Sequence, residues 1–203
     1  MATGTVTRND HARLLRSGLL LEYVTLGWNV VGVVVLAIAA TRAGSVALAG
    51  FGLDSLIEIG ASIVVVWQLT GTAANRERTA MRLIGTAFML LAVYIAAQSL
   101  YVVMRGEQPA VSLAGIAWTA VTCVVMLALA YGKTRVGAAL DNPVLRTESR
   151  VTLVDAYLAG AVLVGLVLNA LVGWWWADPL AGLIIVVYGL KEGWEALQHR
   201  PGG

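Results

Sequence analysis

Six long runs of apolar residues dominate the chain, and short polar segments separate them. A helix needs about 20 mostly apolar residues to cross the hydrocarbon core of a bilayer, and each run provides such a length. The pattern therefore predicts an all-α membrane protein, a bundle of six transmembrane helices. We place these helices at 19–40, 45–69, 80–104, 110–132, 148–171 and 178–197.

The connections between the predicted helices are short, and the longest covers residues 132–147. It contains Asp141-Asn142-Pro143, which is typical of a turn or of a helix start. Since no connection is long enough to hold a second domain, we expect one transmembrane domain over residues 19–197. A cytoplasmic segment at 1–18 is expected to precede it, and a short tail at 198–203 to follow it.

Basic residues are distributed unevenly over the two sides of this topology. All Lys and Arg residues except Arg42 and Arg105 fall on the side that carries the two termini. Cytoplasmic segments of membrane proteins carry the excess of Lys and Arg, so both termini are predicted to be cytoplasmic. We expect a multi-pass protein of a bacterial plasma membrane, in contact with the lipid bilayer.

The composition agrees with a membrane location. Hydrophobic residues make up 59% of the 203 residues, charged residues only 13%, and the mean hydropathy is +0.78. A soluble domain of this length needs more charged residues to form its surface. The formal net charge of +2 gives no reason to expect a nucleic-acid partner, and the single Cys123 excludes an internal disulfide.

Carboxylates occur inside the predicted spans, where each costs about 2.5–3.5 kcal/mol at the bilayer centre. Asp54 and Glu58 are four residues apart, so they share one helix face about 6 Å apart along the axis, and Asp155 lies in the span 148–171. We expect no Lys, Arg or His in the membrane interior, and hence no buried salt bridge that neutralises these acids. Two carboxylates so close need a cation or a shared proton, which favours a site that exchanges metal ions with protons.

A structural alternative remains open, in which the acids are protonated and hydrogen-bond between helices. We interpret Glu22, Asn29, Gln98 and Asn169 mainly in this way. The spans 45–69 and 148–171 are rich in Gly, Ala and Ser, which permit close approach of helices. These two helices are therefore predicted to be neighbours, and their acids to come together.

Segments of three predicted helices resemble the second, fifth and sixth helices of the cation diffusion facilitator (cation efflux) family. Residues 45–62, with Asp54-Ser-Leu-Ile-Glu58, resemble the family's second helix, in which two metal ligands lie four residues apart. Residues 148–155 resemble its fifth helix, which supplies the other ligands in a Glu-x-x-His-x-x-x-Asp pattern. Residues 177–183 and 188–193 are similar to its sixth helix, so the resemblance covers nearly the whole chain.

The resemblance implies a divalent cation site between the second and fifth helices, with Asp54, Glu58 and Asp155 as ligands. It also implies export of the metal from the cytoplasm by proton antiport, and a homodimer. The divalent cation (zinc, manganese or iron) is expected as the substrate, without an organic cofactor.

The sequence departs from the family pattern at three points. Val151 stands where the family has the metal-binding His, and Glu58 where it usually has Asp. The chain ends at Gly203, so we expect the transmembrane domain without the family's cytoplasmic domain. Water, Glu148 or Asn29 could replace the lost imidazole, and Glu22 is a further auxiliary candidate. Oxygen ligands suit manganese or ferrous iron, whereas imidazole suits zinc.

Two other classes of function compete with transport as readings of the sequence. A non-transporting subunit that dimerises with a full-length cation transporter would explain the missing His and the missing domain. An enzyme is not expected, because the chain has no His-x-x-x-His pair and no serine in a nucleophile motif.

Overall fold

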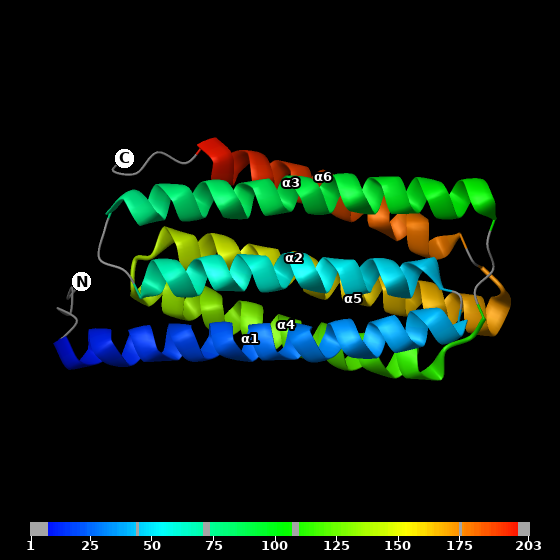
Figure 1. Cartoon of the computed structure of the whole chain (residues 1–203), viewed down its shortest axis with the longest axis horizontal. Coiled ribbons are helices and arrows are strands. Elements are labelled where there is room, and N and C mark those ends of the chain that lie inside the picture. Colours follow the sequence, from blue (N-terminus) through cyan, green and yellow to red (C-terminus); the bar gives the residue numbers. More distant parts are fainter. Residues whose placement is uncertain (1–7, 44, 71–73, 107–109, 175, 199–203) are drawn as a thin grey trace, which may run out of the picture.

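The computed structural model describes residues 8–43, 45–70, 74–106, 110–174 and 176–198. Within these ranges it leaves out the side chains of residues 8, 9, 46, 74–77, 177–185, 188 and 192. The described residues form six helices and no strand (Figure 1). The helices are α1 Arg8–Ala43, α2 Val46–Leu69, α3 Ala74–Arg105, α4 Leu113–Ala139, α5 Pro143–Val172 and α6 Ala177–Gln198.

Several helices extend beyond the apolar runs that predicted them. Helix α1 begins at Arg8 rather than at residue 19, and α4 ends at Ala139 rather than at residue 132. The apolar run marks the part of a helix that suits lipid, whereas hydrogen bonding continues until a residue interrupts it. The predicted long connection at 132–147 is therefore reduced to residues 140–142.

The start of α5 follows the predicted turn chemistry. Asn142 is the N-cap residue, since its side chain accepts a hydrogen bond from the backbone N–H of Leu145 at 3.0 Å. Pro143 occupies the first helical position, where its missing N–H has no intrahelical partner to lose. Asp141 has a φ of 49°, a left-handed conformation that Asp tolerates better than most residues. The predicted turn at Asp141-Asn142-Pro143 is confirmed.

Four of the helices form a closed bundle, in which α1 packs on α2, α2 on α5, α5 on α4, and α4 on α1. The remaining two helices, α3 and α6, pack mainly on each other and cover α2 and α5 from one side (Figure 1). The predicted contact between the second and fifth helices is confirmed. Figure 1 also shows that the first turn of α1 and the last turn of α6 lie at the same end of the bundle.

The outward faces of the helices are apolar, as lipid contact requires. Leu90 and Leu100 are each 60% exposed, and Val93 is 64% exposed. A monomeric soluble protein rarely exposes such continuous apolar surface. Among the described residues, α1 to α5 are each long and apolar enough to cross a membrane. Helix α6 has 22 residues, about 33 Å at 1.5 Å per residue, and packs along α3.

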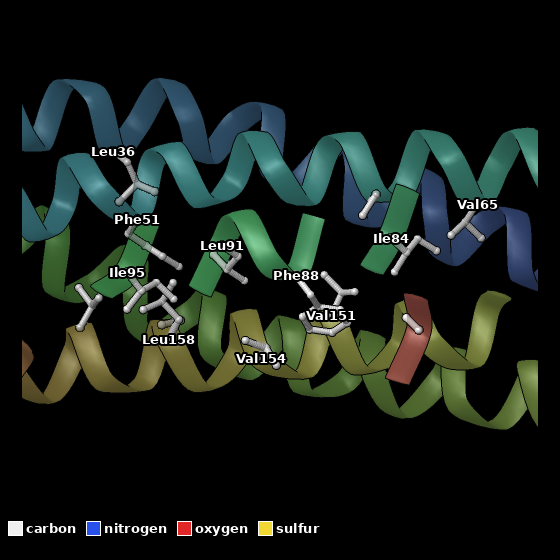
Figure 2. Close-up of a cluster of buried hydrophobic side chains, with 14 of the residues drawn as sticks. Leu36, Phe51, Val65, Ile84, Phe88, Leu91, Ile95, Val151, Val154 and Leu158 are labelled. Atoms are coloured by element: carbon white, nitrogen blue, oxygen red, sulfur yellow. The ribbon is translucent and has the colours of Figure 1, made fainter. Parts of the chain in front are cut away.

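An apolar cluster joins α2, α3 and α5 in the interior (Figure 2). Phe51, Ile84 and Phe88 are among its largest members, and all three are 2% exposed or less. On the α5 side the cluster includes Val151 and Val154. This packing sets the rotation of α5, so that the residues on its other face are turned toward α1, α2 and α4.

Candidate metal site

Asp54 on α2 and Asp155 on α5 face each other in the interior of the four-helix bundle. Each is only 2% exposed, and the two carboxyl groups lie near enough to interact through their charges. Oδ2 of Asp54 and both carboxyl oxygens of Asp155 have no hydrogen-bond donor among the described residues. The structure therefore brings these two predicted ligands together, with oxygen atoms available to a cation or a proton.

Glu58 lies one turn further along α2 than Asp54 and has a different partner. Its Oε1 accepts a hydrogen bond of 2.7 Å from the hydroxyl of Thr152, and the residue is 2% exposed. Within the part of the chain that the structure describes, no three His, Cys, Asp or Glu side chains gather as they would around a metal ion. The three predicted ligands share one region of the bundle, but Glu58 is held by Thr152.

A buried lysine occupies the neighbouring region, which corrects one prediction. Lys133 on α4 is fully buried, and its Nζ donates to Glu148 and, at 3.0 Å, to Thr152. The same Nζ forms an ion pair of 3.2 Å with Oε2 of Glu22. The prediction of no basic residue in the interior is therefore wrong. Helix α4 continues past its apolar run and carries Lys133 inward, where its ammonium group donates two hydrogen bonds and forms an ion pair with Glu22.

The auxiliary candidates have partners other than the acid pair. Glu22 on α1 and Glu148 on α5 are both fully buried, and both are paired with Lys133. Asn29 is 1% exposed, and its amide donates to the backbone carbonyl of Thr25 at 3.0 Å. Glu22 and Glu148 thus belong to an ion-pair cluster, which we define as Lys133, Glu22, Glu148 and Thr152.

The charges in the described interior do not balance. Five carboxylates are buried there against one ammonium group. They are Glu22, Asp54, Glu58, Glu148 and Asp155. Lys133 pairs with two of them, and isolated carboxylates in a medium of low dielectric constant are strongly disfavoured. The remaining acids must bind protons or an external cation.

Val151 does not provide a ligand. It is 1% exposed, and Figure 2 shows it beside Phe88 in the apolar cluster. Thr152, the next residue, is the polar group that α5 turns toward Glu58, and sequence reasoning missed it. The spacing in the sequence could have identified Thr152, since it lies four residues after Glu148 and three before Asp155 and shares their helix face.

Together, the fold and the acids define a multi-pass helical membrane protein with carboxylates in the centre of its bundle. Comparison with known families agrees with this class. Residues 23–199 match the model of the cation efflux transmembrane domain. The chain belongs to the cation efflux family, because this match covers most of its length.

Two relatives illustrate the similarity. Over 74 residues the chain is 38% identical to the cation-efflux pump FieF of Shewanella oneidensis. The aligned region covers 36% of this chain and 25% of the pump. Over 153 residues it is 26% identical to transmembrane protein 163 of Xenopus laevis, covering 70% of this chain and 54% of that protein. The matched regions thus span about half or less of each relative's length.

Proposed function

We propose that this chain exports a divalent metal cation through a membrane site formed by Asp54, Glu58 and Asp155. The observation that carries the proposal is the buried pair Asp54 and Asp155, with carboxyl oxygens that lack a donor among the described residues. Membership of the cation efflux family and the name of the FieF pump support metal transport.

Proton exchange accompanies the transport in this proposal. When the metal leaves, Asp54 and Asp155 can no longer both remain ionised in the buried site. Lys133 makes its contacts with Glu22, Glu148 and Thr152, so it does not replace the departing cation. A proton must enter, and the next metal ion displaces it.

The substrate is a divalent cation that accepts oxygen ligands. Carboxylates are the ligand groups of the proposed site, and the position of the family's His is taken by the apolar Val151. Oxygen-rich sites favour manganese or ferrous iron, and zinc also binds carboxylates. We propose zinc, manganese and iron as the substrates to be tested first.

The proposal includes an orientation and an assembly. Cytoplasmic termini are proposed from the excess of Lys and Arg in the segments on the side of the first turn of α1 and the last turn of α6. A homodimer in the plasma membrane is what the family resemblance implies.

Transport by purified protein in sealed vesicles tests the proposal. We expect Asp54→Asn and Asp155→Asn each to abolish metal uptake and the accompanying proton flux, recorded with dyes for metal and pH inside the vesicles. Asp141→Asn is the matched control, because Asp141 is 98% exposed in the connection before α5. Uptake by both site variants at the wild-type rate would refute the proposed site.

A second candidate function is supported by the same region of the structure. Val151 is packed in the apolar cluster, and no three ligand residues gather around one point among the described residues. These observations suit a regulatory subunit that dimerises with a full-length cation transporter. Purified protein would then show no metal flux, but it would co-purify with the transporter.

A further inference from the structure

Thr152 links the other members of the ion-pair cluster to the proposed metal site. Its hydroxyl oxygen accepts a hydrogen bond from Lys133 at 3.0 Å. The same hydroxyl lies 2.7 Å from Oε1 of Glu58 and 3.1 Å from Oε1 of Glu148. A hydroxyl has one proton to donate, so it can fully serve only one of these two carboxylates at a time.

Two observations show which carboxylate receives this proton. The contact with Glu58 is the shorter one, and Oε1 of Glu148 already accepts a hydrogen bond from Lys133. In the described conformation the hydroxyl therefore donates to Glu58. Lys133 in turn fixes Thr152, since its ammonium group is tied to α1 through Glu22 and to α5 through Glu148.

We infer that Lys133 and Thr152 form a latch that holds Glu58 back from Asp54 and Asp155 until a divalent cation binds. The inference rests on the proposed function and concerns the same site. The bound cation attracts Glu58 as a third ligand, and Glu58 then leaves the Thr152 hydroxyl. Thr152 is thus a positioning residue that lowers the affinity of the site.

Glu148 lowers the free-energy cost of releasing Glu58 from the Thr152 hydroxyl. When Glu58 departs, the Thr152 hydroxyl can turn its proton to Oε1 of Glu148, which already lies at 3.1 Å. No buried donor is then left without an acceptor, which would otherwise destabilise the released state. A moderate affinity suits an exporter, because a site that binds its cation too tightly cannot release it.

Substitution of Thr152 tests the latch through the affinity for metal. Thr152→Val keeps the shape and removes the hydroxyl, so Glu58 is free before the cation arrives. We expect roughly 10-fold tighter binding of Mn²⁺ or Zn²⁺ by titration calorimetry of the purified protein, because a hydrogen bond to a charged group no longer has to be broken. Thr152→Ser retains the hydroxyl and should bind like the wild type.

Thr119→Val is the matched control. Thr119 is also fully buried, but its hydroxyl donates to the carbonyl of Gly115 within α4, at 2.9 Å. The Thr119→Val variant should bind metal with the same affinity as the wild type. If Thr152→Val does not fold, Thr152→Ala removes the same hydroxyl with a residue that favours helix, and the same tightening is expected.

The outcomes separate the two proposals. Unchanged affinity in the variants without the hydroxyl overturns the latch, and weaker binding overturns it by identifying Thr152 as a direct ligand. In both cases the wild type still binds metal, so the proposed function stands. A wild-type protein that binds none of the cations refutes the proposed function and the latch together.

Discussion

A fully buried lysine is stable only where polar or anionic groups replace its lost hydration. Lys133 has two carboxylates and one hydroxyl around its Nζ, from α1 and α5. Such a cluster contributes little net stability compared with apolar packing, but removal of one member leaves the others uncompensated. Lys133 therefore matters most through the charges that it neutralises.

Replacement of Lys133 should strongly destabilise the protein. Lys133→Met leaves Glu22 and Glu148 buried without their cation, and we expect the free energy of unfolding to fall by about 3–5 kcal/mol. Denaturant unfolding of the protein in detergent micelles, followed by circular dichroism, measures the change. Addition of Glu148→Gln to this variant should recover part of the loss, because one buried charge fewer remains.

Lys191→Met is the control for the lysine substitution. The Lys191 side chain is 69% exposed and reaches Glu195 only at 4.0 Å. Exposed pairs on a helix contribute about 0.3–0.5 kcal/mol, so stability should hardly change. If Lys133→Met were as stable as Lys191→Met, the ion-pair cluster would not have the role described.

Two glycines let α3 and α6 approach each other closely. A Cβ atom at Gly193 would lie 2.9 Å from Cβ of Phe88 and 3.1 Å from the carbonyl oxygen of Gly85. A Cβ atom at Gly85 would lie 3.0 Å from the carbonyl oxygen of Gly193. These contacted atoms are backbone oxygens and the Cβ atom of Phe88. They can move only if the helices move, so the two glycines permit the close approach.

Gly193→Ala should therefore force α3 and α6 apart. We expect a loss of about 1–3 kcal/mol in the free energy of unfolding, as for other overpacked interfaces. The transition midpoint in detergent, measured by heating or by denaturant, records the effect.

Gly60→Ala is the matched control on α2. A Cβ atom at Gly60 meets nothing within 4 Å, and Ala favours helix over Gly by about 1 kcal/mol. This variant should be as stable as the wild type or more stable. Equal effects of the two substitutions would argue against close packing of α3 on α6.

The described bundle has two chemically different ends. One end carries the starts of α1 and α3 and the ends of α4 and α6, helix segments whose sequences include the exposed Arg13, Arg82 and Arg135. The ends of α1 and α3, with Arg42 and Arg105 in their last turns, lie at the other end (Figure 1). Cytoplasmic segments of membrane proteins carry the excess of Lys and Arg. This asymmetry therefore predicts that the end with the start of α1 and the end of α6 faces the cytoplasm.

Labelling of single cysteines in intact cells tests this orientation. In a Cys123→Ala background, Ala110→Cys should react with a membrane-impermeant maleimide from outside, because Ala110 is exposed beside the start of α4. Asp141→Cys, at the opposite end, should react only after the cells are opened. The reverse pattern would place the termini outside the cytoplasm.

Much of the bundle could be predicted because a helix that crosses lipid needs a long run of apolar residues. The six helices and the contact between α2 and α5 follow from apolar run length and from the small residues in those runs. The cap at Asn142 was also predictable, since capping depends on neighbours in sequence. The helix ends were less accurate, because polar turns continue the hydrogen bonding beyond the lipid-compatible run.

The acids inside the spans were visible in the sequence because ionisable groups are costly in lipid wherever they lie along a helix. The partners of these acids were not visible, because they depend on the rotation of each helix and on its neighbours. Packing of Val151 against α3 turns Thr152 toward Glu58, and the extension of α4 carries Lys133 between Glu22 and Glu148. Hydropathy thus predicted how the chain lies in a membrane, whereas three-dimensional packing determined which carboxylates are neutralised by Lys133 and which need a proton or another cation.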